Sequence, residues 1–235
     1  MSSSSSKPFY VYTAATPNGH CVTILLEELK ALYCDVECEP SYEAIEIWKT
    51  RHKEPWFLAM NPNGRVPVLL DKTRDNFPIF ETPAIMLYLT GHYDKQKVFA
   101  FNAEKEPKAY SEMLQWLFFA HGGIGPMQGQ CHYFHRYAPE SIELAKRRYL
   151  DETRRLYGVL EFRLEQNRDW LAGPGRGKYT IADMKTYPWV RIHKWAKIES
   201  LDEWPNVKAW ADRITDREAT KRGLNVPVDM SSSRL

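Results

Sequence analysis

Two neighbouring stretches carry residue types that could hold a small peptide by its backbone and its charged ends. In the first, residues 61–71, the turn dipeptide Asn63-Gly64 leads into an extended run that is interrupted by Pro67. Proline has no N–H to give to a sheet, so we expect the backbone of Val66 to pair with a ligand lying alongside as an extra strand. A cis Val66–Pro67 bond would favour that arrangement, whereas Pro67 could also do no more than begin a strand.

The second stretch, residues 80–89, is typical of a helix start. Thr82 is placed to be the N-cap and Pro83 to be the first helical residue. The free N–H groups and positive dipole end of such a helix favour a bound carboxylate, while Glu81, just before the cap, could bind an ammonium. Capping alone would also explain Thr82, so a ligand-binding role needs partners elsewhere in the chain.

The turn after the first expected strand, residues 13–20, is the remaining chemical candidate. Thr16, Asn18 and the N–H groups of the following helix converge where an anion or a thiolate could be stabilised, which is how a thiol pKa near about 8.5 is lowered. Thr16 next to Pro17 is also a typical helix N-cap. The turn contains no cysteine, so any reactive sulfur must come from a ligand.

Thr180 and Asp183 are spaced as a capping box ahead of an apolar run. In such a box a hydroxyl and a carboxylate satisfy the first N–H groups of a helix, which predicts a role in folding. A buried catalytic carboxylate at Asp183 is the alternative, and the spacing favours the box.

Composition excludes several kinds of protein. The 235 residues carry a formal net charge of only +2, which does not suggest nucleic acid or an anionic membrane as a partner. Residues 1–7 are polar and lack an apolar segment, so we expect a disordered leader rather than a signal peptide or a membrane anchor.

The four cysteines show no CxxC pair and no histidine at zinc spacing, so we expect no metal site and a reducing, cytoplasmic location. Cys34 and Cys38 lie in an apparent strand, on one side of it but too far apart to form a disulfide. We interpret the cysteines as buried, ordinary thiols.

The spacing of apolar residues changes along the chain and predicts two domains. Within residues 8–93, strand-like and helical runs alternate as a βαβ unit, a β-hairpin and a helix. Residues 94–106 form a polar linker, and residues 107–228 show only long helical patterns, followed by a tail at residues 229–235. The expected strands are 9–12, 33–37, 66–70 and 77–80, and the expected helices are 22–32, 83–93, 109–119, 142–166, 181–196 and 205–217.

Together these motifs resemble the cytosolic glutathione transferases, from Pro8 to about Val226. The similarity is greatest to the nu class of bacteria and to the transferase-like domain of the fungal nitrogen-regulatory prion protein. It implies a thioredoxin-like α/β first domain, an all-α second domain (the glutathione transferase fold) and a homodimer. The matching segments are residues 16–19, 61–67, 80–82, 116–119, 122–130, 148–149, 152–157 and 180–183.

The resemblance implies a glutathione site that can be carried over residue by residue. Val66, before an expected cis Pro67, would pair with the cysteinyl backbone of glutathione. Glu81 and Thr82 would hold its γ-glutamyl end. The family usually has Ser where this chain has Thr82, but the hydroxyl is kept, so we expect binding to be kept as well.

The sulfur end of that site departs from the commoner pattern. Many transferases activate glutathione with Tyr, Ser or Cys after the first strand, and this turn has none of them; Tyr12 lies within the strand, and alternation assigns it to the core or an interface. Thr16 and Asn18 would lie near the sulfur instead, with Asn18 stabilising the thiolate. Arg148, on a helix of the second domain, matches a position that can approach glutathione.

Activation by an amide and backbone dipoles is expected to be weak, so conjugation of aromatic halides should be slow. The nu-class resemblance implies reduction of small disulfides by bound glutathione, with peroxide reduction by the same thiolate and a role in detoxification. The second substrate, a small apolar electrophile or disulfide, would lie against aromatic and Met side chains that at helical spacing are more often core. These side chains are Trp116, Phe119, Met127, Tyr133 and Phe134.

The helix breakers between Gly122 and Pro126 should interrupt or distort the long helix beside that pocket. Two other functions are compatible with the same fold. One is a regulatory binding protein like the fungal nitrogen regulator, although its long Asn/Gln-rich segment has no counterpart in this sequence, which favours the enzyme. The other is a carrier of hydrophobic ligands.

Overall fold

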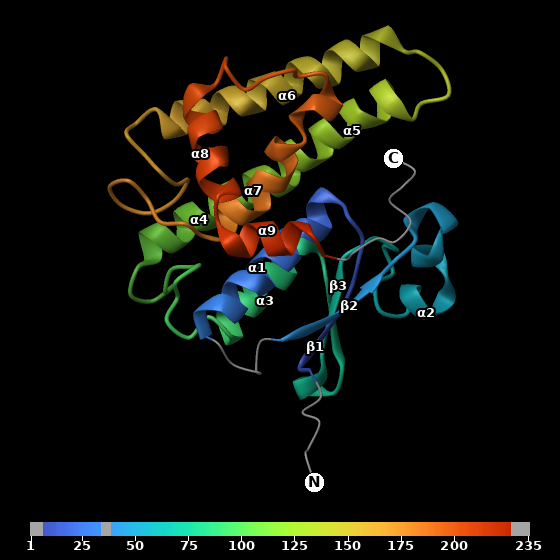
Figure 1. Ribbon diagram of the computed structural model, residues 1–235, viewed down its shortest axis with the longest axis vertical. Coiled ribbons are helices and arrows are strands. Elements are labelled where there is room, and N and C mark those ends of the chain that lie inside the picture. Colours follow the sequence, from blue (N-terminus) through green and yellow to red (C-terminus); the bar gives the residue numbers. More distant parts are fainter. Residues whose placement is uncertain (1–6, 34–38, 227–235) are drawn as a thin grey trace. The chain divides into compact units, whose positions relative to one another are not determined.

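The computed structural model of the chain describes residues 7–33 and 39–226. These residues form two compact units, one drawn from the described residues up to 95 together with residues 217–226, and one from residues 96–216 (Figure 1). The domain limits given above remain predictions, and the units differ from them because the last described helix packs with the first unit. None of the described helices is long and apolar enough to cross a membrane.

The first unit contains a four-stranded sheet with the strand order β2-β1-β3-β4. Strands β1 and β2 are parallel, whereas β3 is antiparallel to both β1 and β4, which confirms the predicted βαβ unit and hairpin. The thioredoxin-like fold predicted for this part is therefore confirmed. The strands are β1 (Phe9–Thr13), β2 (Pro40–Ala44), β3 (Val68–Asp71) and β4 (Phe77–Phe80).

The strand that pairs with β1 begins later in the chain than the predicted start at Tyr33. Tyr33 ends helix α1 (Pro17–Tyr33), and the strand that pairs with β1 is Pro40–Ala44. Residues 34–37 of the predicted strand lie outside the described residues, so the structure contradicts the prediction at Tyr33, which is helical. The proposed arrangement of Cys34 and Cys38 falls outside the described residues.

Alternation along β1 separates the two faces of the sheet. Helices α1 and α3 (Thr82–His92) cover one face of the sheet (Figure 1). Phe9 and Val11 are fully buried on this face, while Tyr10 and Tyr12 face the other way. The short helix α2 (Pro55–Leu58) covers part of that second face through Phe57. Three 3₁₀ turns complete the unit: η2 (Ile47–Lys49), η3 (Arg51–Lys53) and η4 (Lys72–Arg74).

The last described helix, α9 (Glu218–Leu224), packs closely on α1. A Cβ atom added to Gly223 would lie 2.6 Å from the Cα of Ile24, so only glycine allows the two helices to approach this far. The Thr23 hydroxyl donates a hydrogen bond to the Gly223 carbonyl at 2.6 Å. The return of this helix to the first unit was not predicted from the sequence.

The second unit is helical, as predicted. Its long first helix runs through α4, η5 and α5 without a break, but residues 120–124 form a π-helical turn. Pro126 has no N–H for the helical ladder, and the glycines before it relax the backbone, so the predicted distortion is confirmed. The helices are α4 (Pro107–Phe119), η5 (Ala120–Ile124), α5 (Gly125–Arg136), α6 (Glu143–Leu164), α7 (Ile181–Arg191), η6 (His193–Ala196) and α8 (Pro205–Thr215).

The capping box at the start of α7 is present, as predicted. The carboxylate of Asp183 accepts the Thr180 N–H at 2.9 Å and the Leu171 N–H at 3.0 Å, and it is fully buried. Burial raises its pKa to about 6. With its oxygens occupied by donors from its own fold, Asp183 is a structural carboxylate and not a catalytic one.

Candidate functional site

The three candidate stretches meet at one edge of the sheet. In the β1–β3–β4 register, Tyr12 pairs with Val68, and Val68 pairs with Phe80. The end of β1, the start of β3 and the end of β4 therefore lie side by side. Because α1 follows β1 and α3 follows β4, this edge gathers the N-termini of two helices around the residues that precede β3.

Val66 lies just before β3, and the Val66–Pro67 bond is cis, as expected. Pro67 is buried and Val66 is half-buried. Within the described residues, neither the N–H nor the C=O of Val66 has a hydrogen-bond partner. An unpaired donor and acceptor at a sheet edge can bind an extended peptide as an added strand.

Thr82 is not the helix cap that the sequence pattern predicted. The N-cap of α3 is Glu81, the helix begins at Thr82, and neither side chain makes a capping hydrogen bond. Pro83 therefore occupies the second helical position rather than the first, and Thr82 is helical and 3% exposed. The described residues offer its hydroxyl no hydrogen-bond partner, so capping does not explain this side chain.

Glu81 has an unusual backbone conformation for a residue with a side chain. Its φ of 67° lies in the left-handed region, which costs free energy and persists only where the surrounding structure holds it. The first helical hydrogen bond runs from the Ile85 N–H to the Glu81 carbonyl at 2.9 Å. The N–H groups of Thr82 and Ala84 precede this bond and lie at the positive end of α3.

Thr16 is a helix cap, as one interpretation predicted. Its hydroxyl accepts the Gly19 N–H at 3.1 Å, and its carbonyl accepts the His20 N–H at 2.9 Å. Gly19 is required here because a Cβ atom would lie 2.3 Å from the Ala14 carbonyl oxygen. Asn18 is half-buried in the first turn of α1, at the sheet edge that also carries Val66.

Tyr12 belongs to the core of the sheet's second face, as predicted. It packs against the cluster of Ile45, Phe57 and Val68, and its ring lies 5.4 Å from that of Trp56. Burial, followed by the negative charge of Glu43, raises the pKa of the Tyr12 hydroxyl. The Tyr12 side chain therefore contributes to the packing of this face.

The sequence analysis missed a group of basic side chains beside the Asn63-Gly64 turn, His52, Lys53 and Arg65, which we call the basic rim. Lys53 donates through Nζ to the carbonyls of Asn63 (3.2 Å) and Gly64 (2.8 Å), and His52 and Arg65 lie close by. The His52 Nδ1 is buried without a partner among the described residues, and burial followed by the charges of Lys53 and Arg65 lowers its pKa. The run Arg51-His52-Lys53 was a visible signal, but only the fold brings it to the Asn63-Gly64 turn.

Arg148 lies on α6 in the second unit, where it lines a cavity of about 530 Å³ together with Met127. Arg148 makes no ion pair within the described residues, whereas Arg155 in the same cavity binds Glu152 at 2.8 Å. The remaining residues of the cavity wall are Leu144, Tyr149 and Asp151.

The aromatic residues predicted to contact a second substrate are distributed along α4 and α5. Phe134 stacks on Tyr149 with ring centroids 5.5 Å apart, and Trp116 packs edge-on against Phe119. Tyr133 is 45% exposed. Only Met127 of the predicted set lines the cavity, and no three His, Cys, Asp or Glu residues of the described chain are placed to hold a metal ion.

Comparison with known proteins identifies the family. Residues 7–91 match the glutathione S-transferase N-terminal domain and residues 128–218 match the glutathione S-transferase C-terminal domain. The disulfide-bond oxidoreductase YfcG of Escherichia coli is 38% identical over 218 residues, which cover 91% of this chain and 93% of that protein. The chain belongs to the glutathione S-transferase family.

Other members of the glutathione S-transferase family extend the comparison. The glutathione transferase URE2P6 of Phanerochaete chrysosporium, solved in complex with oxidised glutathione, superposes with a TM-score of 0.84 at 34% identity, covering 93% of this chain and 95% of that one. The transcriptional regulator URE2 of Saccharomyces cerevisiae is 30% identical over 89% of this chain, and the match spans 65% of that protein. The predicted resemblance to both the bacterial and the fungal members is thus confirmed.

Proposed function

We propose that this glutathione S-transferase binds glutathione at the edge of its first unit and uses the bound thiolate to reduce small disulfides. The observation that carries the proposal is the unpaired N–H and C=O of Val66, which lie between the N-termini of α1 and α3. Relatives named as disulfide-bond oxidoreductases and a neighbour solved with oxidised glutathione support it. Peroxide reduction and slow conjugation to apolar electrophiles would use the same thiolate.

The peptide ligand has a charge pattern that matches this edge. With its cysteinyl backbone paired to Val66, the γ-glutamyl end would reach α3, where the helix N-terminus and the Thr82 hydroxyl bind the carboxylate and Glu81 binds the ammonium. The glycyl carboxylate, at the opposite end, would reach the basic rim that contains Lys53 and Arg65.

The thiol would lie at the start of α1. The positive end of this helix and the Asn18 side chain would favour the thiolate over the thiol. That thiolate attacks one sulfur of a disulfide RSSR, forming the mixed disulfide GS–SR and releasing RS⁻. A second glutathione thiolate then attacks GS–SR at the glutathione sulfur, giving GSSG and the second RS⁻.

The cysteines that the structure describes are poorly placed to take part in this exchange. Cys21 and Cys131 are both buried. Burial raises the pKa of Cys131 to about 11, which keeps it protonated. A glutathione-dependent reaction fits a reducing compartment, so we propose a cytoplasmic location and a role in detoxification.

Exposed aromatic side chains support a homodimer. Phe118 on α4 is 50% exposed and Phe162 on α6 is 66% exposed, while Phe77 on β4 is 52% exposed. A second copy of the chain would cover such apolar surface. The molar mass in solution, compared with that of Phe162→Asp, tests the dimer. We also propose Arg148 as a glutathione contact, on the resemblance to the family.

Turnover of hydroxyethyl disulfide with glutathione tests the enzymatic proposal. We expect Asn18→Ala to lower kcat by roughly 10–100-fold, because it removes a donor that stabilises the thiolate. Tyr12→Phe is the matched control and should stay within about twofold, since the phenol does not activate the thiol.

Tight glutathione binding without turnover by the native chain would contradict the enzyme and favour a regulatory binding protein. The identity with the transcriptional regulator URE2 is the observation behind that second candidate. Binding of apolar dyes that glutathione does not displace would instead indicate a ligand carrier.

A further inference from the structure

Asn61 fixes the loop in front of β3. Its side chain is 1% exposed, donates through Nδ2 to the Arg65 carbonyl at 2.7 Å and accepts the Asn63 N–H at Oδ1 at 3.0 Å. The Gly64 N–H closes the turn on the Asn61 carbonyl at 2.9 Å. Gly64 has a φ of 60°, and a Cβ atom there would lie 2.9 Å from His52 O. The loop therefore has a defined shape before any ligand arrives.

This loop presents Asn63 to Glu81. The Asn63 Nδ2 donates to the Glu81 Oε1 at 3.3 Å, across the sheet edge from one candidate stretch to the other. The Glu81 backbone is held at a φ of 67°, so the position of its Cβ is set by the fold and the direction of its carboxylate by such contacts.

We infer that Asn63 is a positioning residue that aims the Glu81 carboxylate at the ligand ammonium. A neutral amide suits this task because it orients one oxygen of the Glu81 carboxylate without neutralising its negative charge. A carboxylate has about four lone-pair sites, so the ammonium can still bind beside the amide. The cation beside the loop, Lys53, donates to the backbone carbonyls of Asn63 and Gly64 and so helps to hold the loop. The inference rests on the proposed glutathione site and deepens it.

A double-mutant cycle measures this coupling. Glutathione affinity is determined by calorimetry for the native chain, Asn63→Ala, Glu81→Gln and the double variant. We expect Asn63→Ala to weaken binding about three- to tenfold in the native background and less than about twofold in the Glu81→Gln background, because a hydrogen bond to a charged group is lost only where the charge exists. In turnover, the KM for glutathione should rise while kcat stays unchanged.

A ligand lacking the ammonium gives an independent readout. N-acetylglutathione should bind the native chain and Asn63→Ala with equal affinity. Equal losses of glutathione affinity in both backgrounds, or no loss in Asn63→Ala while Glu81→Gln binds weakly, would overturn the positioning role and leave the proposed function intact. A native chain that binds no glutathione would overturn both. Unchanged melting temperatures show that the exposed Asn63 position does not act through folding.

Discussion

The indole N–H of Trp210 donates a hydrogen bond to the Asp183 Oδ1 at 2.9 Å, which joins α8 to the capping box of α7. Both side chains are fully buried. The same oxygen accepts the Leu171 N–H, and the other accepts the Thr180 N–H and hydroxyl. The Asp183 carboxylate thus joins α8, the start of α7 and the segment at Leu171. Both of its oxygens accept hydrogen bonds from these donors.

Asp183→Asn should destabilise the protein by roughly 3 kcal/mol at neutral pH. An amide has only one acceptor oxygen, and its NH₂ group would face buried donors. Asp212→Asn, the same change on the exposed side of α8, is the control and should stay within about 0.5 kcal/mol. Urea unfolding monitored by tryptophan fluorescence measures both, and equal midpoints for Asp183→Asn and the native chain would show that the network is not required.

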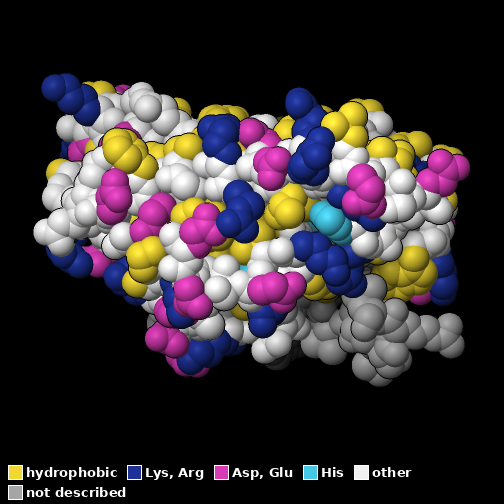
Figure 2. Space-filling view, turned by 90° about the horizontal axis from the view of Figure 1, so that it is seen from above, with side chains coloured by type: hydrophobic (Ala, Val, Ile, Leu, Met, Phe, Trp, Pro, Cys, Tyr) yellow, Lys and Arg dark blue, Asp and Glu magenta, His cyan; other side chains and the backbone are white. Residues whose placement is uncertain are grey.

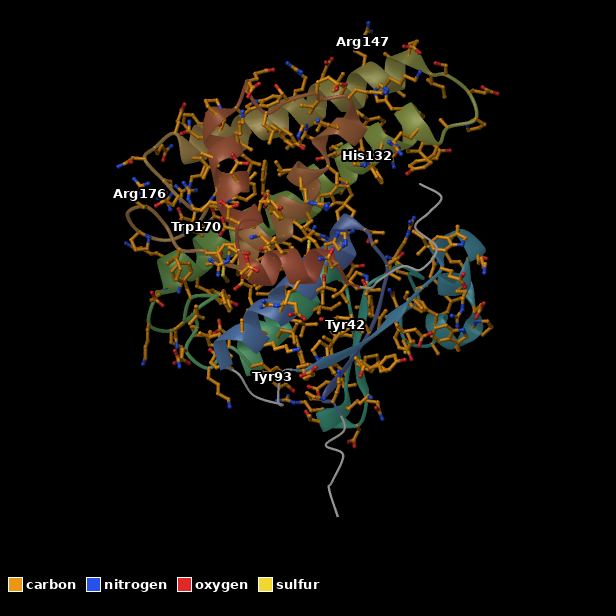
Figure 3. All side chains as sticks on the ribbon, viewed as in Figure 1. Tyr42, Tyr93, His132, Arg147, Trp170 and Arg176 are labelled. Atoms are coloured by element: carbon orange, nitrogen blue, oxygen red, sulfur yellow. The ribbon has the colours of Figure 1, made fainter. Side chains whose placement is uncertain are left out.

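His132 on α5, labelled in Figure 3, predicts a pH dependence of stability. It stacks on Trp189 and is 6% exposed. Burial, followed by the positive charges of Arg136 and His135, lowers its pKa from 6.5 to about 4. Between these two pH values His132 is protonated in the unfolded chain but neutral in the folded chain. The contribution of neutral, buried His132 to stability is therefore present above pH 6.5 and is lost as the pH falls toward 4.

His132→Phe isolates that contribution because phenylalanine keeps an aromatic ring but does not titrate. Between pH 7.5 and pH 5, the free energy of unfolding of the native chain should fall by about 2 kcal/mol more than that of His132→Phe. Urea unfolding at the two pH values gives the difference. Parallel pH profiles would mean that His132 keeps an ordinary pKa in the folded protein.

Thr82 provides the sharpest test of the γ-glutamyl end of the proposed site. Thr82→Ala should weaken glutathione binding by about tenfold or more, because a hydroxyl hydrogen bond to a carboxylate is lost. Thr82→Ser keeps the hydroxyl and should bind within about threefold of the native chain. Calorimetry decides between them, and equal losses in both variants would assign Thr82 to packing alone.

Much of the fold was accessible from local patterns, and the failures have physical causes. Long apolar spacing located most helices, and Thr180 with Asp183 identified the start of α7 correctly. Residue preferences suggested that a strand begins at Tyr33, but α1 ends at that residue and the strand paired with β1 begins at Pro40. The return of α9 to α1 depends on a contact between residues 23 and 223, which no local pattern encodes.

In the candidate site, too, some residues could be predicted from local sequence signals and others could not. Val66, Glu81 and Thr82 stood out because proline and helix-start chemistry are local signals. The roles of Asn61 and Asn63 depend on side chains meeting across a loop and a sheet edge, so spacing could not reveal them. Figure 2 shows Lys and Arg side chains intermixed with Asp and Glu on one face of the molecule. The net charge, which is a sum over the sequence, could not predict where these side chains lie.

Gly223→Ala should destabilise the first unit by about 2 kcal/mol, because the added methyl group would lie 2.6 Å from the Cα and 2.7 Å from the N of Ile24. Backbone atoms cannot move aside as a flexible side chain can, so α9 must shift away from α1 and lengthen the hydrogen bond from Thr23.

Gly91→Ala is the matched control, since that glycine lies in α3 with nothing within 4 Å of the added Cβ. There alanine should stabilise the helix by about 0.5–1 kcal/mol. Thermal unfolding of the two variants should give melting temperatures on opposite sides of the native value; a Gly223→Ala protein as stable as the native chain would show that α9 does not need this close approach.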